Sequence, residues 1–145
     1  MPRDVEAQIL LVEDNPGDVL MVTQALSHSE VPNRVHVARD GAEALDFAFQ
    51  RGVHADAPRP DLVFLDINLP KVDGHEVLAM LKDDEDLRTI PVVMLTSSDA
   101  ESDVRAAYRT HVNAYLTKGF DFAELEAVLR ESLHYWIRRV RHLQA

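Results

Sequence analysis

The chain has 145 residues, the usual length of one domain, and 46% of them are hydrophobic, which is enough to bury a core. Its 25 acidic and 15 basic residues leave a net charge of −10, the wrong sign for binding nucleic acid phosphates, and without cysteine there is no disulfide or thiolate site. No apolar run reaches the roughly 18 residues of a membrane span, so we expect a cytoplasmic domain that binds neither membrane nor nucleic acid.

Short apolar runs alternate along the chain with longer segments of helical spacing. Runs typical of strands occur at residues 9–12, 34–38, 62–65, 92–95 and 114–116. Helices are predicted at residues 16 to about 27, 41–49, 74–82, 99 to about 111 and 121 to about 143. Residues that favour helix starts or stops stand at several of these ends: Asn15 and Pro16, Asp40, Gly52, Asp99 and Asp121.

Five successive strand–helix units predict an α/β fold. The runs 62–65 and 92–95 are apolar throughout, as in parallel strands covered on both faces, so we predict a doubly wound (βα)5 parallel sheet with right-handed crossovers. One domain should span residues 1–145, with a core at about 8–133 and an extension of the last helix at about 134–145. That helix would be roughly 33 Å long, more than a small sheet needs.

Polar residues follow four of the predicted strands. Glu13 and Asp14 follow the first strand, Asp66 the third, Thr96 the fourth and Lys118 the fifth. Ligands of open parallel sheets bind beyond these carboxyl ends. Three carboxylates brought together repel one another unless a cation neutralises them, and this donor set suits Mg²⁺. A hydroxyl and an ammonium suit phosphoryl oxygens, so the set predicts phosphorylation of an aspartate.

Each of these residues also has a simpler explanation when it is considered alone. Asp66 could belong to a turn, and Glu13 and Asp14 could stabilise the start of the following helix. Thr96 could cap a helix and Lys118 could be solvated. Together the simpler explanations are weak, because surface constraints do not require acid, hydroxyl and cation to end four strands on one edge.

Longer motifs surround these residues. They are residues 9–15 (ILLVEDN), 61–70 (DLVFLDINLP), Asp73-Gly74, 91–96 (PVVMLT) and 114–118 (AYLTK). With these motifs the chain resembles the receiver domains of two-component response regulators from Ile9 to about Leu133. The resemblance implies the flavodoxin-like strand order 2-1-3-4-5.

The resemblance also assigns roles to the acids. Asp66 matches the phosphoacceptor, and Asp14 and Asp66 match the carboxylates that bind Mg²⁺ directly. Glu13 matches the acid that acts through water, and Asn68 matches the residue whose backbone carbonyl completes the metal site.

Three further matches concern the phosphoryl group and the response to it. Thr96 and Lys118 match the phosphate-sensing hydroxyl and the phosphate-binding lysine, and Tyr115 matches the aromatic switch, although it could equally be a half-buried core tyrosine. The family usually places a cis proline after the lysine, where this chain has Gly119. The geometry of that peptide therefore cannot be carried over.

The implied function is that of a response regulator that takes a phosphoryl group from a sensor histidine kinase and signals by a surface change. Such a protein is not an enzyme, although it takes part in its own phosphorylation and dephosphorylation. The loop at 53–60, the opening at residues 15–18 and the Tyr135-Trp136 ending resemble small stand-alone regulators of phytochrome-type kinases. The alternative is an interaction module that works without phosphorylation.

Two other classes fit poorly. A haloacid dehalogenase phosphatase needs a second carboxylate where this chain has Asn68, and a flavin-binding protein needs a phosphate loop where it has Glu13 and Asp14.

The last predicted helix carries apolar residues that its own sheet does not need. Tyr135, Trp136, Ile137 and Val140 would form an exposed patch near its end. We expect a homodimer through the fourth and fifth helices and the fifth strand, with these four residues in or near the contact.

Overall fold

The computed structural model describes residues 6–119 and 121–139. In this part of the chain one sheet contains five parallel strands in the order β2-β1-β3-β4-β5, which confirms the predicted fold class and strand order. The strands are β1 (Ala7–Val12), β2 (Asn33–Ala38), β3 (Leu62–Leu65), β4 (Val92–Thr96) and β5 (Ala114–Thr117).

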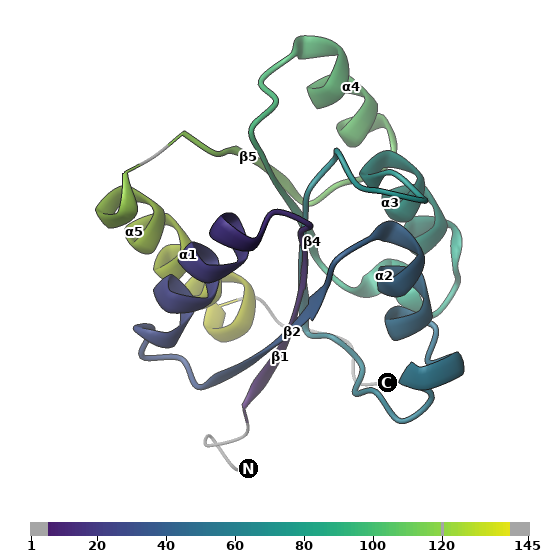
Figure 1. The fold of residues 1–145 in the computed structure, drawn as a ribbon, viewed down its shortest axis with the longest axis horizontal. Coiled ribbons are helices and arrows are strands. Elements are labelled where there is room, and N and C mark those ends of the chain that lie inside the picture. The colour runs from purple at the N-terminus through teal and green to yellow at the C-terminus, as the bar shows by residue number, and fades with distance from the viewer. Residues whose placement is uncertain (1–5, 120, 140–145) are drawn as a thin grey trace.

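Helices cover both faces of the sheet. They are α1 (Pro16–Ser27), α2 (Gly41–Ala48), α3 (Gly74–Asp83), α4 (Glu101–Arg109) and α5 (Phe122–Leu133). Figure 1 shows α1 and α5 on one face and α2, α3 and α4 on the other. Because both faces are covered, every residue of β3 and of β4 is buried, as their continuous apolar sequences predict.

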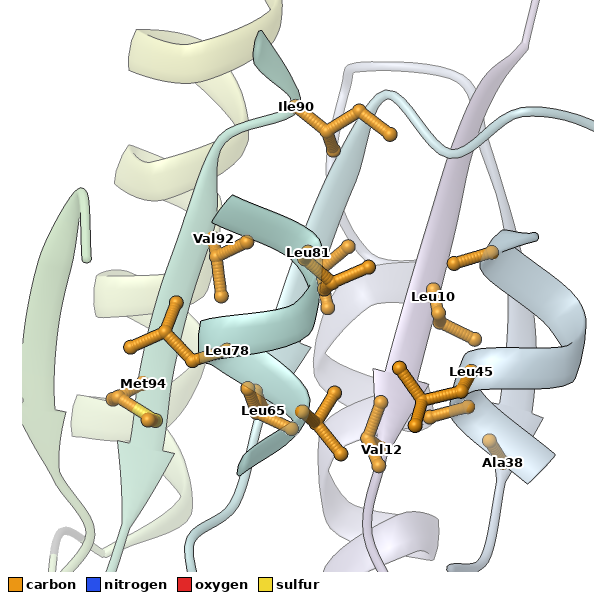
Figure 2. Packing of buried hydrophobic residues seen from close by; sticks show 14 of the residues in the cluster. Leu10, Val12, Ala38, Leu45, Leu65, Leu78, Leu81, Ile90, Val92 and Met94 are labelled. Atoms are coloured by element: carbon orange, nitrogen blue, oxygen red, sulfur yellow. The ribbon is translucent and has the colours of Figure 1, made fainter. Parts of the chain in front are cut away.

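The core consists of two clusters, one on each side of the sheet. In the first cluster, shown in Figure 2, Leu45 of α2 and Leu78 of α3 pack on side chains of the sheet such as Leu10, Leu65 and Met94. The second core cluster joins the opposite face of the sheet to the apolar sides of α1 and α5. The clusters hold the strands so that their carboxyl ends form one edge.

Most predicted helix starts are confirmed, and one is wrong. The side chains of Asn15, Asp40 and Asp121 each accept a hydrogen bond from the backbone N–H three residues later. Asp99 was expected to open the fourth helix, but Ala100 precedes α4 and makes no side-chain cap. Instead the acid Asp103, in the first turn, accepts a hydrogen bond from the loop before the helix.

One predicted helix stop is wrong, and one approximate helix end lies two residues later than the structure has it. Gly52 does not stop the second helix, because α2 ends at Ala48 and Gln50 already takes a left-handed conformation with φ of 55°. The Gln50 side chain donates a hydrogen bond to the Ala57 carbonyl at 2.6 Å, which helps to fix this bend, and Gly52 begins a 3₁₀ turn (Gly52–His54). The fourth helix ends at Arg109, before His111, which is left-handed with φ of 69°.

The last helix is not α-helical throughout, contrary to the prediction. After Leu133 it continues as a π-helix (His134–Arg139), whose wider turn changes the faces that side chains present. Val140 and the predicted end at Leu143 lie outside the described residues. None of the described helices has the length and apolar character that crossing a membrane requires.

Candidate functional site

The predicted site residues lie together at the carboxyl ends of the strands, where backbone hydrogen bonds join neighbouring strands. The ladder of the sheet continues one residue beyond three strands. The N–H of Glu13 donates to Ala38, that of Asp66 to Val12 at 3.1 Å, and that of Lys118 to Thr96 at 2.6 Å. Because sheet hydrogen bonds fix this backbone, the side chains start from rigid positions.

Three carboxylates meet at this edge. Glu13, Asp14 and Asp66 each offer a carboxylate oxygen, and these oxygens lie within 4.8 Å of one another. Glu13 and Asp66 are buried, with 2% and 7% of their surface exposed, whereas Asp14 is exposed. Burial raises the pKa of Glu13 above its ordinary value of 4.5, against the hydrogen bond from Lys118, and the charge of Asp66 adds to the rise. A group of carboxylate oxygens like this one is the kind of ligand set that a hard divalent cation requires.

Lys118 reaches across this edge from the end of β5. Its ammonium donates to Glu13 Oε1 at 2.6 Å and to Asp18 Oδ2 at 2.8 Å, and lies 3.7 Å from Asp66 Oδ2. Burial by itself would lower the pKa of Lys118, but the bonds to Asp18 and Glu13 outweigh it and raise the pKa above 10.5. With only 11% of its side chain exposed, Lys118 is a partly buried cation held by carboxylates and not a freely solvated one.

Asp66 stands in a confined position. Its Oδ1 accepts a hydrogen bond from the N–H of Ile67 at 2.7 Å, which leaves Oδ2 facing the Lys118 ammonium. Gly74 packs closely beneath it, because a Cβ atom there would lie 2.1 Å from the carbonyl oxygen of Asp66. The Asp73-Gly74 motif therefore has a steric reason: only glycine lets α3 start so near the Asp66 backbone.

Thr96 and Tyr115 both contact the loop that follows β4. The buried Thr96 hydroxyl accepts a hydrogen bond from the N–H of Ser98 at 3.4 Å, and the Tyr115 hydroxyl donates to the Ser98 carbonyl at 2.8 Å. Tyr115 is half-buried against the first core cluster. Burial raises its pKa, so the phenol stays protonated and able to donate.

Two further predicted positions lie in exposed loops. Asn68 is exposed, two residues after Asp66. The described residues contain no cis peptide bond, and Gly119 has a φ of 132°, in the region that favours glycine.

Four residues of this region were missed by the sequence reasoning. Asp18 binds Lys118, and its position in the first turn after the acids could have indicated it, since that turn begins at the same edge. Asp103 accepts a hydrogen bond from the Ser98 hydroxyl and also contacts His75 Nε2, and nothing in the spacing of these three residues along the chain indicates this.

The predicted contact residues near the end of the last helix differ in exposure. Tyr135 is 55% exposed, whereas Trp136 and Ile137 are partly buried against the second core cluster. The rings of Tyr135 and Trp136 pack edge to face, with centroids 5.0 Å apart. Part of this apolar group therefore belongs to the core of the domain itself.

The chain resembles known proteins along most of its length. A family model described as the response regulator receiver domain matches residues 9–130. Response regulator Rcp1 of Synechocystis sp. is 44% identical over 132 residues, which cover 91% of this chain and 90% of that protein. The probable methanogenesis regulatory protein FilR2 of Methanothrix harundinacea is 44% identical over 130 residues, covering 89% of this chain and 83% of that protein.

Solved structures agree with the fold. The phosphorylated cyanobacterial phytochrome response regulator RcpA superimposes with a TM-score of 0.91 at 41% identity, covering 97% of this chain and 100% of that one. The Mn²⁺-bound form of Rcp1 superimposes with a TM-score of 0.88 at 42% identity, covering 95% of this chain and 99% of that one.

Proposed function

Because this chain belongs to the response regulator receiver domain family, we propose that it accepts a phosphoryl group from a sensor histidine kinase on Asp66. The observation that carries the proposal is the setting of this carboxylate. One oxygen is held by the Ile67 amide and the other faces the Lys118 ammonium at 3.7 Å, next to two more acids. This arrangement orients one oxygen for attack and supplies positive charge where a phosphoryl group would bring negative charge.

The transfer itself needs little from the protein beyond positioning. An oxygen of Asp66 forms a bond to phosphorus while the phosphorus–nitrogen bond of the phosphohistidine breaks, and the electron pair stays on the imidazole nitrogen, which takes a proton from solvent. An ionised carboxylate has no proton to lose, so no general base is required. Lys118 can turn from Glu13 and Asp18 toward the new phosphoryl oxygens.

The donor set fits a divalent cation, and we propose Mg²⁺. Asp14 and Asp66 would ligate it directly, Glu13 through water, and Asn68 through its backbone carbonyl. Bound there, Mg²⁺ would neutralise negative charge on the phosphoryl oxygens. Burial raises the pKa of Glu13 and the charge of Asp66 adds to the rise, so a cation bound there would favour the ionised form of Glu13.

Phosphorylation would act through Thr96 and Tyr115. A phosphoryl group adds charge and acceptor oxygens, which attract the Thr96 hydroxyl and favour one of two arrangements of the loop that both residues contact. The protein would thus be a signalling protein that takes part in its own phosphorylation and dephosphorylation.

The proposal extends to partners. RcpA is a phytochrome response regulator, which supports a phytochrome-type kinase as the phosphoryl donor here.

We also propose a single receiver domain with an extended last helix, located in the cytoplasm. It would form homodimers through α4, β5 and α5, and the net charge of −10 argues against nucleic acid as a partner.

The competing function is a receiver-like interaction module that does not depend on phosphorylation, and Asp66→Asn separates the two. With Mg²⁺ and acetyl phosphate, the wild-type chain should gain one acid-labile phosphoryl group by mass spectrometry, and the variant none. Asp56→Asn, an exposed acid in the loop before β3, is the matched control and should be labelled like wild type. Equal labelling of Asp66→Asn and wild type would exclude Asp66 as acceptor, and no labelling of wild type would favour the interaction module.

A further inference from the structure

The Lys118 ammonium is surrounded by three carboxylates that come from different elements. It donates to Glu13 Oε1 at 2.6 Å and to Asp18 Oδ2 at 2.8 Å, and it lies 3.7 Å from Asp66 Oδ2. Glu13 and Asp66 follow strands β1 and β3, whereas Asp18 stands in the first turn of α1. Two of the three ammonium protons are therefore bonded to acids other than Asp66, and one of these acids lies outside the strand ends.

Asp18 is held in place by the start of its helix. Its N–H donates to the side chain of Asn15 at 3.0 Å, and the next residue, Val19, is buried in the second core cluster. An acid is also favoured in the first turn by the helix dipole. The Asp18 carboxylate thus starts from a fixed backbone, and it meets Lys118 with 30% of its own side chain exposed.

The chain after Lys118 leaves the lysine side chain room to move. Gly119 has a φ of 132°, and a Cβ atom there would meet no atom of the described chain within 4 Å. Asp18, Lys118 and Gly119 also line one cavity, with a volume of about 270 Å³. The ammonium can therefore shift between Asp18 and Asp66 without displacing packed side chains, and the strength of its contacts with the acids decides where it lies.

The two acids that bond Lys118 differ in their relation to the proposed metal site. Glu13 belongs to the group whose oxygens lie within 4.8 Å of one another, so it would share its negative charge with a bound cation. That sharing weakens the attraction between Glu13 and Lys118, because two positive charges then draw on one carboxylate and repel each other. Asp18 is not in this group, so its attraction for Lys118 would persist when the metal site is filled.

We propose that Asp18 is a positioning residue that competes with a phosphoryl group on Asp66 for the Lys118 ammonium, and so limits how strongly Lys118 stabilises that group. This inference rests on the proposed function, because it concerns the phosphoryl group that Asp66 would carry. Within the described chain Asp18 has no hydrogen bond or ion pair with Asp66, so it acts through Lys118.

The competition predicts two effects of opposite sign when the charge of Asp18 is removed. Lys118 would then be attracted mainly by Glu13 and Asp66 and would lie closer to both. An anionic group on Asp66 gains a stronger contact with the ammonium, so it should bind more tightly. A cation held by the same acids meets a nearer positive charge, so it should bind more weakly.

Asp18→Asn tests both effects, because it keeps the shape of the side chain and an oxygen that can accept from Lys118. The probe for the anion is beryllofluoride, which binds an aspartate oxygen in the shape of a phosphoryl group. With saturating Mg²⁺ the variant should bind beryllofluoride roughly fivefold more tightly than wild type, the upper range for one partly exposed ion pair. Without beryllofluoride it should bind Mg²⁺ about twofold more weakly. Both affinities are measured by NMR titration in about 0.5 M salt, which screens charges that are not in contact.

Two further variants control for a general effect of charge. Asp121→Asn removes another exposed acid, three residues after Lys118, and keeps the cap of α5, since asparagine caps helices as well as aspartate does. It should match wild type in both titrations. Asp18→Glu keeps the carboxylate and should lie nearer to wild type than Asp18→Asn does.

Three results would overturn the role of Asp18 and leave the proposed function intact. They are unchanged or weaker beryllofluoride binding by Asp18→Asn, a shift of both affinities in the same direction, and equal effects of Asp18→Asn and Asp121→Asn. A wild-type chain that binds no beryllofluoride with Mg²⁺ present would instead overturn the proposed function, and the role of Asp18 with it.

Discussion

Lys118 is held by two carboxylates, Glu13 and Asp18, and neither is the proposed phosphoacceptor. The Lys118 ammonium remains 3.7 Å from Asp66 Oδ2, which is too far for a hydrogen bond but near enough to balance the charge of the Asp66 carboxylate. A new phosphoryl group on Asp66 would compete for this ammonium with two acids at once. Asp14 is exposed and is not among the carboxylates that Lys118 contacts in the described part of the chain, so its oxygens can meet a cation from solvent.

Asp14→Ala tests the metal site. The variant removes one of few direct carboxylate ligands, so its affinity for Mg²⁺ should fall by roughly tenfold or more, and phosphorylation by acetyl phosphate should slow with it. The fold should survive, because Asp14 is exposed and belongs to a group of like charges. An NMR titration with Mg²⁺ measures the affinity, with Asp56→Ala as the control that should bind like wild type. Identical titration curves for Asp14→Ala and wild type would show that Asp14 is not a ligand.

The meeting of residues at the strand ends could be predicted from the sequence, because their positions depend only on the parallel sheet. A parallel sheet puts Glu13, Asp66, Thr96 and Lys118 on one edge wherever the strands lie in sequence. Ser98 and His75 could not be found in this way. They meet through Asp103, on a helix that approaches α3 in three dimensions, and the chain separates His75 and Asp103 by 28 residues.

At the scale of elements, α3 is fixed at both ends. Its first residue, Gly74, lies against the backbone of Asp66, and near its last turn Lys82 reaches the loop before β4 and the residue before β5. The helix is therefore tied to the site at one end and to the opposite edge of the sheet at the other.

Gly74→Ala tests the close contact at the start of α3. The added Cβ would lie 2.1 Å from the Asp66 carbonyl oxygen and 2.6 Å from the Ile67 Cα, and backbone atoms cannot turn aside as a side chain can. The free energy of unfolding should fall by about 3 kcal/mol or more, measured by urea denaturation. Gly17→Ala is the control, because its new Cβ meets only the Asn15 side chain, at 3.2 Å. Its free energy of unfolding should fall much less. Equal losses in both variants would contradict the steric role of Gly74.

Lys82 gives a prediction for the dependence of stability on pH. Burial lowers its pKa from 10.5 to about 8, although its ammonium donates to Arg88 O, Ile90 O and Asn113 Oδ1. The folded chain thus loses this proton at a lower pH than the unfolded chain does, and unfolding takes up a proton between these values. The contribution of Lys82 to the free energy of unfolding should therefore rise as the pH increases from about 8 to 10.5.

The matched comparison is Lys82→Met, which keeps an unbranched side chain one atom shorter and removes its charge. Denaturation curves of both proteins across this pH range cancel the titration of all other groups. The difference in free energy of unfolding, wild type minus variant, should increase with pH. A difference that stays constant or falls would show that the folded chain does not disfavour the Lys82 charge.

Helix starts and the last helix show why element boundaries were only partly predictable. Asp40 and Asp121 cap their own helices through a bond to a residue three positions on, which is local information. Asp99 resembles them in sequence, but the loop before α4 is determined by the bond from Ser98 to Asp103. The π-helix from His134 was not predicted because hydrophobic spacing over one turn does not separate it from an α-helix.

At the scale of the whole molecule, β5 lies at one edge of the sheet, between α4 and α5 along the chain. An edge strand leaves backbone groups unpaired on one side, and proteins usually cover or protect such an edge. Exposed side chains on the two flanking helical segments, Tyr108 at 52% and Tyr135 at 55%, offer aromatic surface for a partner. These features support the proposed homodimer, in which each copy covers the same face of the other.

Tyr135→Ala is the variant that tests the dimer most directly. Trp136 and Ile137 pack partly on the second core cluster, so shortening either would weaken the domain as well as any contact, whereas Tyr135 is 55% exposed. An aromatic residue central to an interface typically contributes about 2 kcal/mol or more, which weakens dimerisation by roughly 30-fold when it is lost. Light scattering at micromolar concentration should give a dimer for wild type and a shift toward 16.4 kDa for Tyr135→Ala. Leu20→Ala, which removes a side chain of 58% exposure on α1, should leave the mass unchanged. A wild-type mass of 16.4 kDa both with and without acetyl phosphate would exclude the proposed dimer through α4, β5 and α5.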